Sequence, residues 1–298
     1  MTATPATPSR ELRAWLADTV GAGARVVRCR RLTGGITSHV HLVTVERRGR
    51  RDAYVLRSWD DPLPPYARGA VPLEAAILAA LATADIPAPR LVASLDAAPG
   101  PALVMTRVPG RVHLMPRDRD AWLRQMAAML ARIHALDVAA PAYEAWLDVA
   151  RLAPPADSAR PELWRDAIAL VSSPPPATAP VFVHHDYQHF NLLWTRDRLT
   201  GVVDWTYAAR GPAASDAGHC RLNLALLFSP ELAERFRELY EADAGRRVDP
   251  WWDVRALLAF GPAWRQFLPL QVDGRAPLDT AGMLTRVEAV LEGALRRV

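Results

Sequence analysis

The chain has 298 residues, half of them hydrophobic, and a formal net charge of +4, which is enough material for one large core or two smaller ones. It has no apolar run of about 18 residues and no basic-then-apolar pattern near its start, which argues against a transmembrane helix and a secretory signal. Its two cysteines, Cys29 and Cys220, form no CxxC pair, which argues against a disulfide framework or a zinc–thiolate site and predicts a reducing, cytoplasmic location.

The first 107 residues are predicted to be rich in strands. An amphipathic helix over residues 9–21 comes first, with Ser9 as its N-cap and Gly21 at its end. Three strand-like segments then form an antiparallel meander, and a second helix precedes a strand hairpin. The strands are predicted at residues 25–32, 39–46, 52–59, 90–96 and 101–108, and the second helix at 72–84.

After residue 107 the pattern becomes mainly helical. A long helix is predicted over residues 120–137, and the proline-rich residues 152–180 are predicted to be a loop around a short helix. Short strands return between residues 180 and 205. Helical periodicity then recurs at residues 215–228, 231–242, 251–268 and 280–295. The sequence therefore predicts an α+β fold with two domains, residues 1–107 and residues 108–298.

The excess positive charge lies in the first domain, which has fourteen arginines against nine acidic residues. The chain contains no lysine, so any role usually given to lysine falls to arginine. Basic and aromatic residues are not interleaved as a nucleic-acid surface requires, so no nucleic-acid partner is expected. The charge fits either a site for the phosphates of a small ligand or a solvated arginine surface.

Residues 183–194, "VHHDYQHFNLLW", concentrate polar side chains between apolar ends. One interpretation is a metal site, because His184, Asp186 and the distant His219 have the form of an iron site with two histidines and one carboxylate. Arg221 would then bind an acidic cosubstrate. Such sites belong to a double-stranded β-helix, whereas helices follow this motif. A zinc site would need a second ligand cluster, which the sequence lacks.

The other interpretation is phosphoryl transfer, which uses more of the chain. This chemistry needs a carboxylate near the acceptor hydroxyl, an amide and a second carboxylate on magnesium, and a cation on the nucleotide phosphates. Asp186 and Asn191 stand five residues apart, and a short predicted hairpin returns Asp204 to the same end as Asn191. Oxygen ligands of this kind suit Mg²⁺.

These motifs resemble the aminoglycoside phosphotransferase and choline kinase-like family, which shares the protein-kinase fold. The family pattern of His-Gly-Asp, four residues and Asn reads "HHDYQHFN" here, and the second magnesium motif reads "VDW" around Asp204. "GPAASDAGH" resembles the segment that follows, and "MLARIHALD" the helix beneath the active site. The resemblance implies a two-lobed fold, with a five-stranded antiparallel N-terminal lobe and a mainly helical C-terminal lobe.

The resemblance also implies a nucleotide site in the first domain. Arg57 would hold the α- and β-phosphates with its guanidinium, and Glu74 would pair with Arg57 and fix its side chain. Glycine between two strands lets the backbone approach a phosphate. The remaining residues implied at this site are Gly34 and Gly35, the hydroxyl donors Thr37 and Ser38, and Thr106 and Val108 in "LVMTRVPG", the segment that receives the adenine.

In the second domain the resemblance makes Asp186 the base, or the group that orients the acceptor hydroxyl. His184 is expected to support the loop, and Asp216 is expected to be the buried acid that braces it. His185 replaces the family's glycine, so its side chain is expected to crowd the loop or face solvent. His189 is expected to be exposed.

The implied activity is transfer of the γ-phosphate of ATP or GTP, with Mg²⁺, to a hydroxyl of a small molecule, such as an aminoglycoside or another antibiotic. A pseudokinase that binds nucleotide without turnover is the alternative, favoured by His185. The acidic residues 231–253 would suit a polyamine, although such a surface is as often plain solvation. Most of the nearby tryptophans are expected in the core. A monomer or homodimer is expected, with no membrane partner.

Overall fold

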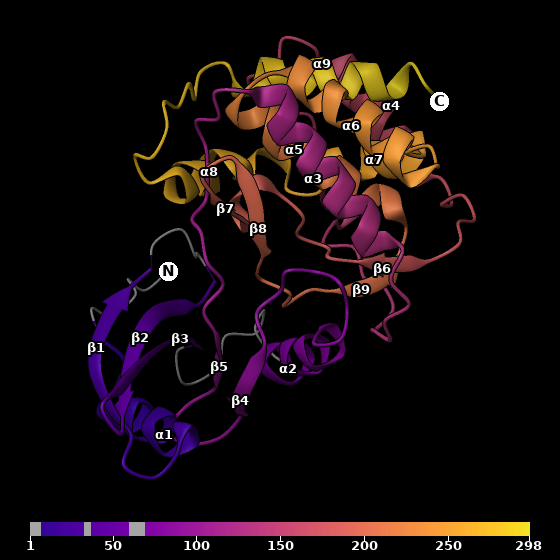
Figure 1. Ribbon diagram of the computed structural model, residues 1–298. Coiled ribbons are helices and arrows are strands. Elements are labelled where there is room, and N and C mark those ends of the chain that lie inside the picture. The colour runs from indigo at the N-terminus through magenta and orange to yellow at the C-terminus, as the bar shows by residue number, and fades with distance from the viewer. Residues whose placement is uncertain (1–6, 33–36, 60–68) are drawn as a thin grey trace. The chain divides into compact units, whose positions relative to one another are not determined.

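The computed structural model describes residues 7–32, 37–59 and 69–298 (Figure 1). The chain forms two compact units, of which the first comprises Met1–Gly110 with Thr200–Tyr207 and the second Arg111–Leu199 with Ala208–Val298. Within the described residues, no helix is both long enough and apolar enough to cross a membrane. The segment 200–207 thus belongs to the first unit although it is far from that unit in sequence.

The first unit contains a five-stranded antiparallel sheet with the strand order β1-β2-β3-β5-β4. The strands are β1 (Arg25–Arg31), β2 (His39–Arg47), β3 (Arg50–Ser58), β4 (Leu91–Leu95) and β5 (Ala102–Thr106). The prediction of five antiparallel strands is therefore confirmed. Strand β2 buries alternate residues, whereas β5 is buried from Ala102 to Met105. Val43 and Val45 of β2 and Ala102 and Val104 of β5 form part of the apolar face of the sheet.

Helix α1 (Arg10–Val20) covers this apolar face. Its first turn is capped because the Oγ of Ser9 accepts a hydrogen bond from the backbone amide of Leu12, at 3.1 Å. Leu12 and Leu16 then pack with Val43, Leu56 and other strand residues in the core. Helix α2 (Ala70–Leu81) packs against β4, and almost all of its buried residues are aliphatic, which makes the burial of Glu74 among them conspicuous.

The second unit is mainly helical (Figure 1). Its helices are α3 (Arg119–His134), α4 (Pro161–Ser172), α5 (Ala213–Leu227), α6 (Pro230–Ala244), α7 (Pro250–Leu258), α8 (Trp264–Val272) and α9 (Met283–Leu295). Helix α5 is buried along almost its whole length, because it packs against α6, α7 and α9. Its buried residues include the polar Asp216, His219 and Arg221.

Helices α5 and α7 approach each other closely at Gly218. A Cβ at this position would lie 2.6 Å from the Cβ of Ala256, closer than two carbon atoms can pack. The close approach brings α7, with Asp253 and Arg255, alongside the α5 turn that carries Ser215 and His219. A glycine that looks unremarkable in the sequence therefore sets the spacing of the helices that support the site.

Two short sheets carry the polar segment of residues 183–194. Strand β6 (Val181–Val183) pairs with β9 (Ala209–Gly211), and β7 (Leu192–Thr195) pairs with β8 (Arg198–Val202). A short 3₁₀ turn, His189–Asn191, connects the polar loop to β7. The strand β9 is not predicted from the sequence, because three residues are too few to show a period.

The continuous helical periodicity of residues 251–268 is misleading. The chain leaves α7 at Leu258, passes through a 3₁₀ turn at Gly261–Ala263 and begins α8 at Trp264. Gly261 has a φ of +48°, which is outside the right-handed helical region and which glycine adopts at little cost. The apolar pattern persists because both helices bury one face, so periodicity alone does not reveal the break.

Candidate active site

Asp186 lies on the loop after β6 and is held by three side chains. Its Oδ1 accepts a hydrogen bond from Nε2 of Gln188 at 2.6 Å and lies 2.9 Å from Nε2 of His219. Its Oδ2 accepts a hydrogen bond from Nδ2 of Asn191 at 2.9 Å. The side chain is still 19% exposed. The carboxylate is therefore fixed in orientation and still accessible to a reactant.

Asp216, in the first turn of α5, fixes the backbone that leads to Asp186. Its two carboxylate oxygens accept hydrogen bonds from the amides of His184 and His185, both at 2.7 Å. The Nε2 of His134 lies 3.1 Å from the same carboxylate. Burial alone would raise the pKa of Asp216, but His134 and the amide of His184 hold it below its usual value. The geometry is that of a buried acid bracing the loop, the role that the resemblance implies for Asp216.

His185 has a φ of +70°, in the left-handed region that costs a residue with a Cβ about 1–2 kcal/mol. Its side chain is buried and does not face solvent. The imidazole stacks on the ring of Trp146, with centroids 4.2 Å apart and planes at 9°. The loop thus keeps the backbone conformation that a glycine would favour, and the ring contact helps to offset the strain.

The expectation that His189 is exposed is wrong. The side chain is fully buried among Trp122, Phe190 and Phe228. Burial lowers the pKa of His189 to about 3, so the ring stays neutral at physiological pH. His189 therefore supports the loop from below as an aromatic core residue.

The first unit contains a set of polar side chains around the buried Arg57, which we call the Arg57 cluster: Ser38, Arg57, Glu74, Asp204 and Thr206. The guanidinium Nη1 of Arg57 donates to Oε2 of Glu74 at 3.0 Å, to Oδ1 of Asp204 at 2.7 Å and to the hydroxyl of Thr206 at 2.5 Å. Its Nε donates to Oγ of Ser38 at 2.7 Å. The pairing of Arg57 with Glu74 has the geometry expected from the sequence.

The charges around Arg57 keep its guanidinium group protonated. Burial opposes the charge of Arg57, but Asp204 and Glu74 outweigh it and keep the arginine pKa above its usual value. Burial raises the pKa of Glu74, and Arg57 opposes that rise. Asp204 has a φ of +66°, a strained conformation for aspartate. Strain of this kind persists where neighbours fix a residue, as Arg57 and Thr206 fix Asp204.

The remaining residues implied at the nucleotide site are Gly34, Gly35, Thr37, Thr106 and Val108. Gly34 and Gly35 lie outside the described residues, and Thr37 lies in a bend before β2. The hydroxyl of Thr106 accepts a hydrogen bond from the amide of Arg90 at 2.8 Å, which ties the end of β5 to the segment before β4. Val108 is partly buried after β5. The structure thus brings Ser38 to Arg57 and leaves Thr106 with a backbone partner.

The iron-site interpretation finds no support in the part of the chain that is described. No group of three or more histidine, cysteine or acidic side chains among those residues is arranged to hold a metal ion. His219 does approach Asp186, but as a hydrogen-bond partner. Arg221 is buried and pairs with Asp253 and Glu234, so it does not face a cosubstrate.

Four of the acidic residues of α6 and α7 pair with arginines. Glu234 pairs with Arg221 and Arg237, Asp253 pairs with Arg221 and Arg297, and other acids of the segment pair within α6. These pairs are Arg235 with Glu238 and Arg237 with Glu241. The net negative charge that the sequence suggested for a polyamine is therefore largely neutralised by internal ion pairs.

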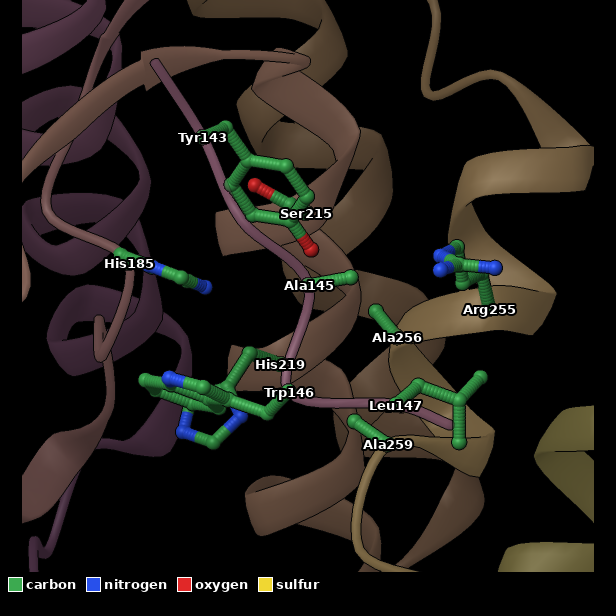
Figure 2. A pocket seen from close by; sticks show the side chains of 10 residues that line it. All are labelled: Tyr143, Ala145, Trp146, Leu147, His185, Ser215, His219, Arg255, Ala256 and Ala259. Carbon is green, nitrogen blue, oxygen red and sulfur yellow. The ribbon is translucent and has the colours of Figure 1, made fainter. Parts of the chain in front are cut away.

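A pocket of about 300 Å³ opens in the second unit (Figure 2). Residues 143–147, the loop at His185 and the helices α5 and α7 surround it. Tyr143, Trp146, His185 and His219 provide aromatic walls, and Arg255 provides a cation. No pattern in the sequence indicates Tyr143, Trp146 or Gln188. The sequence suggests His219 only as a metal ligand, although His219 follows Asp216 by three residues and so shares its helix face.

The fold matches that of solved phosphotransferase structures. A macrolide 2′-phosphotransferase, MphH from Brachybacterium faecium, is 20% identical, with 93% of this chain and 97% of that chain covered and a TM-score of 0.58. A thermostable mutant of aminoglycoside phosphotransferase APH(4)-Ia is 18% identical, with coverages of 94% and 98% and a TM-score of 0.59. A streptomycin–ATP complex of APH(2″)-IIa is 16% identical, with coverages of 88% and 91% and a TM-score of 0.57.

The predicted fold class, α+β with a protein-kinase-like arrangement, is confirmed by these structures. Among curated protein sequences, none matches the chain. The model of the phosphotransferase enzyme family (APH) matches residues 28–252. The chain belongs to the phosphotransferase enzyme family, and the resemblance inferred from its motifs is confirmed.

Proposed function

We propose that the protein transfers the γ-phosphoryl group of ATP or GTP to a hydroxyl group of a small molecule. The observation that carries this proposal is the Asp186 carboxylate, oriented by Asn191 and Gln188 on a loop braced by Asp216. In the reaction the acceptor oxygen forms a bond to the γ-phosphorus, and the bond from that phosphorus to the β,γ-bridging oxygen breaks. The hydroxyl proton leaves to Asp186, and the nucleoside diphosphate departs.

In this proposal Asp186 orients the acceptor hydroxyl and accepts its proton. Because phosphoryl transfer has a loose transition state, positioning contributes more than early proton removal. The hydrogen bonds from Gln188 and Asn191, and the His219 contact, fix the carboxylate before the acceptor arrives. Less reorganisation is then needed during the reaction.

The Arg57 cluster is proposed to bind the nucleotide phosphates. Arg57 carries a permanent charge, and Ser38 beside it accepts its Nε–H and so keeps its own hydroxyl proton for a phosphate oxygen. Gly34, Gly35 and Thr37 are proposed at the same phosphates, and Thr106 and Val108 beside the adenine. Residues 1–107 then form the nucleotide-binding lobe and residues 108–298 the lobe for the acceptor.

The donor atoms of Asn191 and Asp204 fit magnesium, because amide and carboxylate oxygens are the ligands that this hard cation prefers. Asn191 uses its amide nitrogen on Asp186, which is compatible with a metal on its oxygen. A magnesium ion held by these two residues would neutralise charge that develops on the phosphate oxygens. We also propose that the acceptor is an antibiotic, as in the names of the similar structures. The proposed location is the cytoplasm.

Calorimetry with ATP and with GTP, in the presence and absence of Mg²⁺, tests the proposal. We expect nucleotide binding that depends on Mg²⁺ and that is lost in the Asp204→Ala variant. Nucleotide binding that is unchanged by chelation of Mg²⁺ and by Asp204→Ala would contradict the magnesium assignment. An assay of nucleoside diphosphate release with a mixture of small alcohols separates the enzyme from the pseudokinase alternative, in which nucleotide binds but no diphosphate forms.

A further inference from the structure

The pocket of the second unit adjoins the proposed catalytic carboxylate. His219 lines the pocket and also lies 2.9 Å from Oδ1 of Asp186 through its Nε2. His185, on the opposite wall from Arg255 in Figure 2, directly precedes Asp186 in the chain. A molecule in the pocket can therefore present a hydroxyl group at the His185–His219 side, next to Asp186.

The pocket is partly open to solvent. Its space of about 300 Å³ includes the open mouth, so this figure does not set the size of the occupant. The side chains that line the pocket therefore indicate the kind of ligand that it binds.

The walls suit a planar ring. Trp146 is 36% exposed, although its neighbours His185, His219 and Phe260 all pack against it. Tyr143 approaches His185 from another side, with ring centroids 4.5 Å apart. An exposed tryptophan on a pocket wall provides a stacking surface, because aromatic rings gain both buried area and favourable ring geometry there.

The charge of the pocket is positive at one end. No acidic residue is among the lining residues, and Arg255 forms no ion pair with any residue that the structure describes. Its Nε is buried without a hydrogen-bond partner in the same part of the chain, and its guanidinium lies over the ring of Trp251 at 5.4 Å. Most arginines of α5, α6 and α9 pair with acids, so Arg255 differs from its neighbours.

Tyr143, which lines the same pocket, does not offset the positive charge of Arg255. Burial raises the pKa of Tyr143 to about 12, while Arg255 opposes the rise. The phenol is therefore neutral at physiological pH and does not cancel the charge of Arg255. A polycation would place ammonium groups beside a fixed guanidinium, whereas an anionic group would gain a charge-assisted hydrogen bond there.

We infer that the phosphoryl acceptor is a hydroxy compound with a planar ring and an acidic group, and not a polyamine. Its ring stacks on Trp146, its carboxylate or phosphate binds Arg255, and its hydroxyl faces Asp186. The statement that this compound accepts the phosphoryl group rests on the proposed kinase function. The binding preference of the pocket itself does not depend on that function.

Three probes with the same ring and different charge test the inference: 4-hydroxymethylbenzoate, 1,4-benzenedimethanol and 4-hydroxymethylbenzylamine. Their binding to the full chain is measured by calorimetry without nucleotide, at millimolar probe concentrations. We expect the carboxylate to bind about tenfold or more tightly than the neutral diol, and the amine to bind most weakly. Nucleoside diphosphate release with ATP and Mg²⁺ is measured separately for each probe.

Two variants assign the preference to the pocket. Arg255→Gln is expected to remove the advantage of the carboxylate over the diol, and Trp146→Ala to weaken all three probes about two- to tenfold. The matched controls are Arg247→Gln, which removes an exposed arginine outside the pocket, and Leu270→Ala, which removes an exposed apolar side chain. Both controls are expected to bind the probes as the unmodified chain does.

The outcomes separate the inference from the proposed function. Preference for the amine, a carboxylate preference that survives Arg255→Gln, or no binding of any probe overturns the inference. Charge-dependent binding without diphosphate release from any acceptor supports the pocket preference and counts against the kinase function. Diphosphate release with a polyamine, unaffected by Arg255→Gln, supports the kinase function and overturns the inference.

Discussion

The Arg57 cluster and the Asp186 loop both bury charged groups, but they fix them in different ways. Arg57 is held by two carboxylates, of Glu74 and Asp204, so each charge is balanced by another buried charge. Asp186 is held mainly by neutral amides, on a backbone fixed by Asp216. Removing one charge from the cluster leaves an opposite charge uncompensated, whereas neutralising Asp186 leaves partners that can bond to an amide. Substitutions should therefore alter binding and stability in the first region and chemistry in the second.

The largest expected effect is on turnover. Asp186→Asn keeps the shape of the side chain but removes the group that accepts the proton, a contribution of typically about 10²–10⁴-fold in rate. We expect kcat to fall by about that factor while nucleotide affinity stays near wild type. Diphosphate release and calorimetry measure the two quantities. Asp204→Asn should lower both of them, and wild-type turnover in Asp186→Asn would show that the loop is structural.

The brace is expected to matter next, through stability. In Asp216→Asn, the backbone amide of either His184 or His185 would face an N–H group instead of an acceptor. We therefore expect the free energy of unfolding to fall by about 3 kcal/mol. Urea unfolding measures this difference. The control is Asp137→Asn, because Asp137 is an almost fully exposed partner of Arg210 and its loss should cost less than about 1 kcal/mol. Equal effects of the two substitutions would contradict the role of Asp216.

A smaller effect separates the members of the Arg57 cluster. Arg57→Ala should weaken nucleotide binding about 10- to 100-fold, because a charged donor to phosphate is lost. Glu74→Ala should do less, since Glu74 only orients Arg57. Calorimetry measures the affinities, and Arg51→Ala on the same strand, an exposed arginine, serves as the control. If Glu74→Ala were the more damaging variant with its fold intact, the phosphate role of Arg57 would be wrong.

The effect that is smallest near neutral pH is a change in pH dependence. The folded state keeps His189 neutral down to about pH 3, whereas an unfolded chain protonates it near pH 6.5. Above about pH 6.5, His189 therefore leaves the free energy of unfolding independent of pH. Below that pH, His189 lowers the free energy of unfolding by up to about 1.4 kcal/mol per pH unit as the pH drops towards 3. His189→Phe should keep stability at pH 7.5 and flatten this slope in urea unfolding between pH 6 and 4. Identical slopes would mean that His189 is not held neutral.

Local patterns predicted the sheet and most helices, because strand alternation and helix capping are properties of neighbouring residues. They also drew attention to Asp186, Asn191 and Asp204, whose residue types and spacing suit one chemistry. The pairing of Arg57 with Asp204, 147 residues away, is not predicted from the sequence. A short-range pattern carries no information about which distant charges meet.

Other features depended on backbone detail that no periodicity reports. The positive φ of His185 and the helix break at Gly261 are single-residue events. Trp146 and Tyr143 lie in a segment without a clear pattern, so the sequence did not indicate the pocket that they line. The acidic segment resembles a cation site in the sequence because some of its arginine partners lie far away in the chain, as Arg221 does in α5 and Arg297 does after α9.

The arginine in the Arg57 cluster has a practical consequence for covalent labelling. Acylating reagents that mark a phosphate-binding site attack the amine of a lysine, and this chain has no lysine side chain to react. Enzymatic acetylation cannot switch off a guanidinium in the same manner. Dicarbonyl reagents, which condense with guanidinium groups, are the suitable footprinting chemistry, and the burial of Arg57 should make it one of the slower arginines to react.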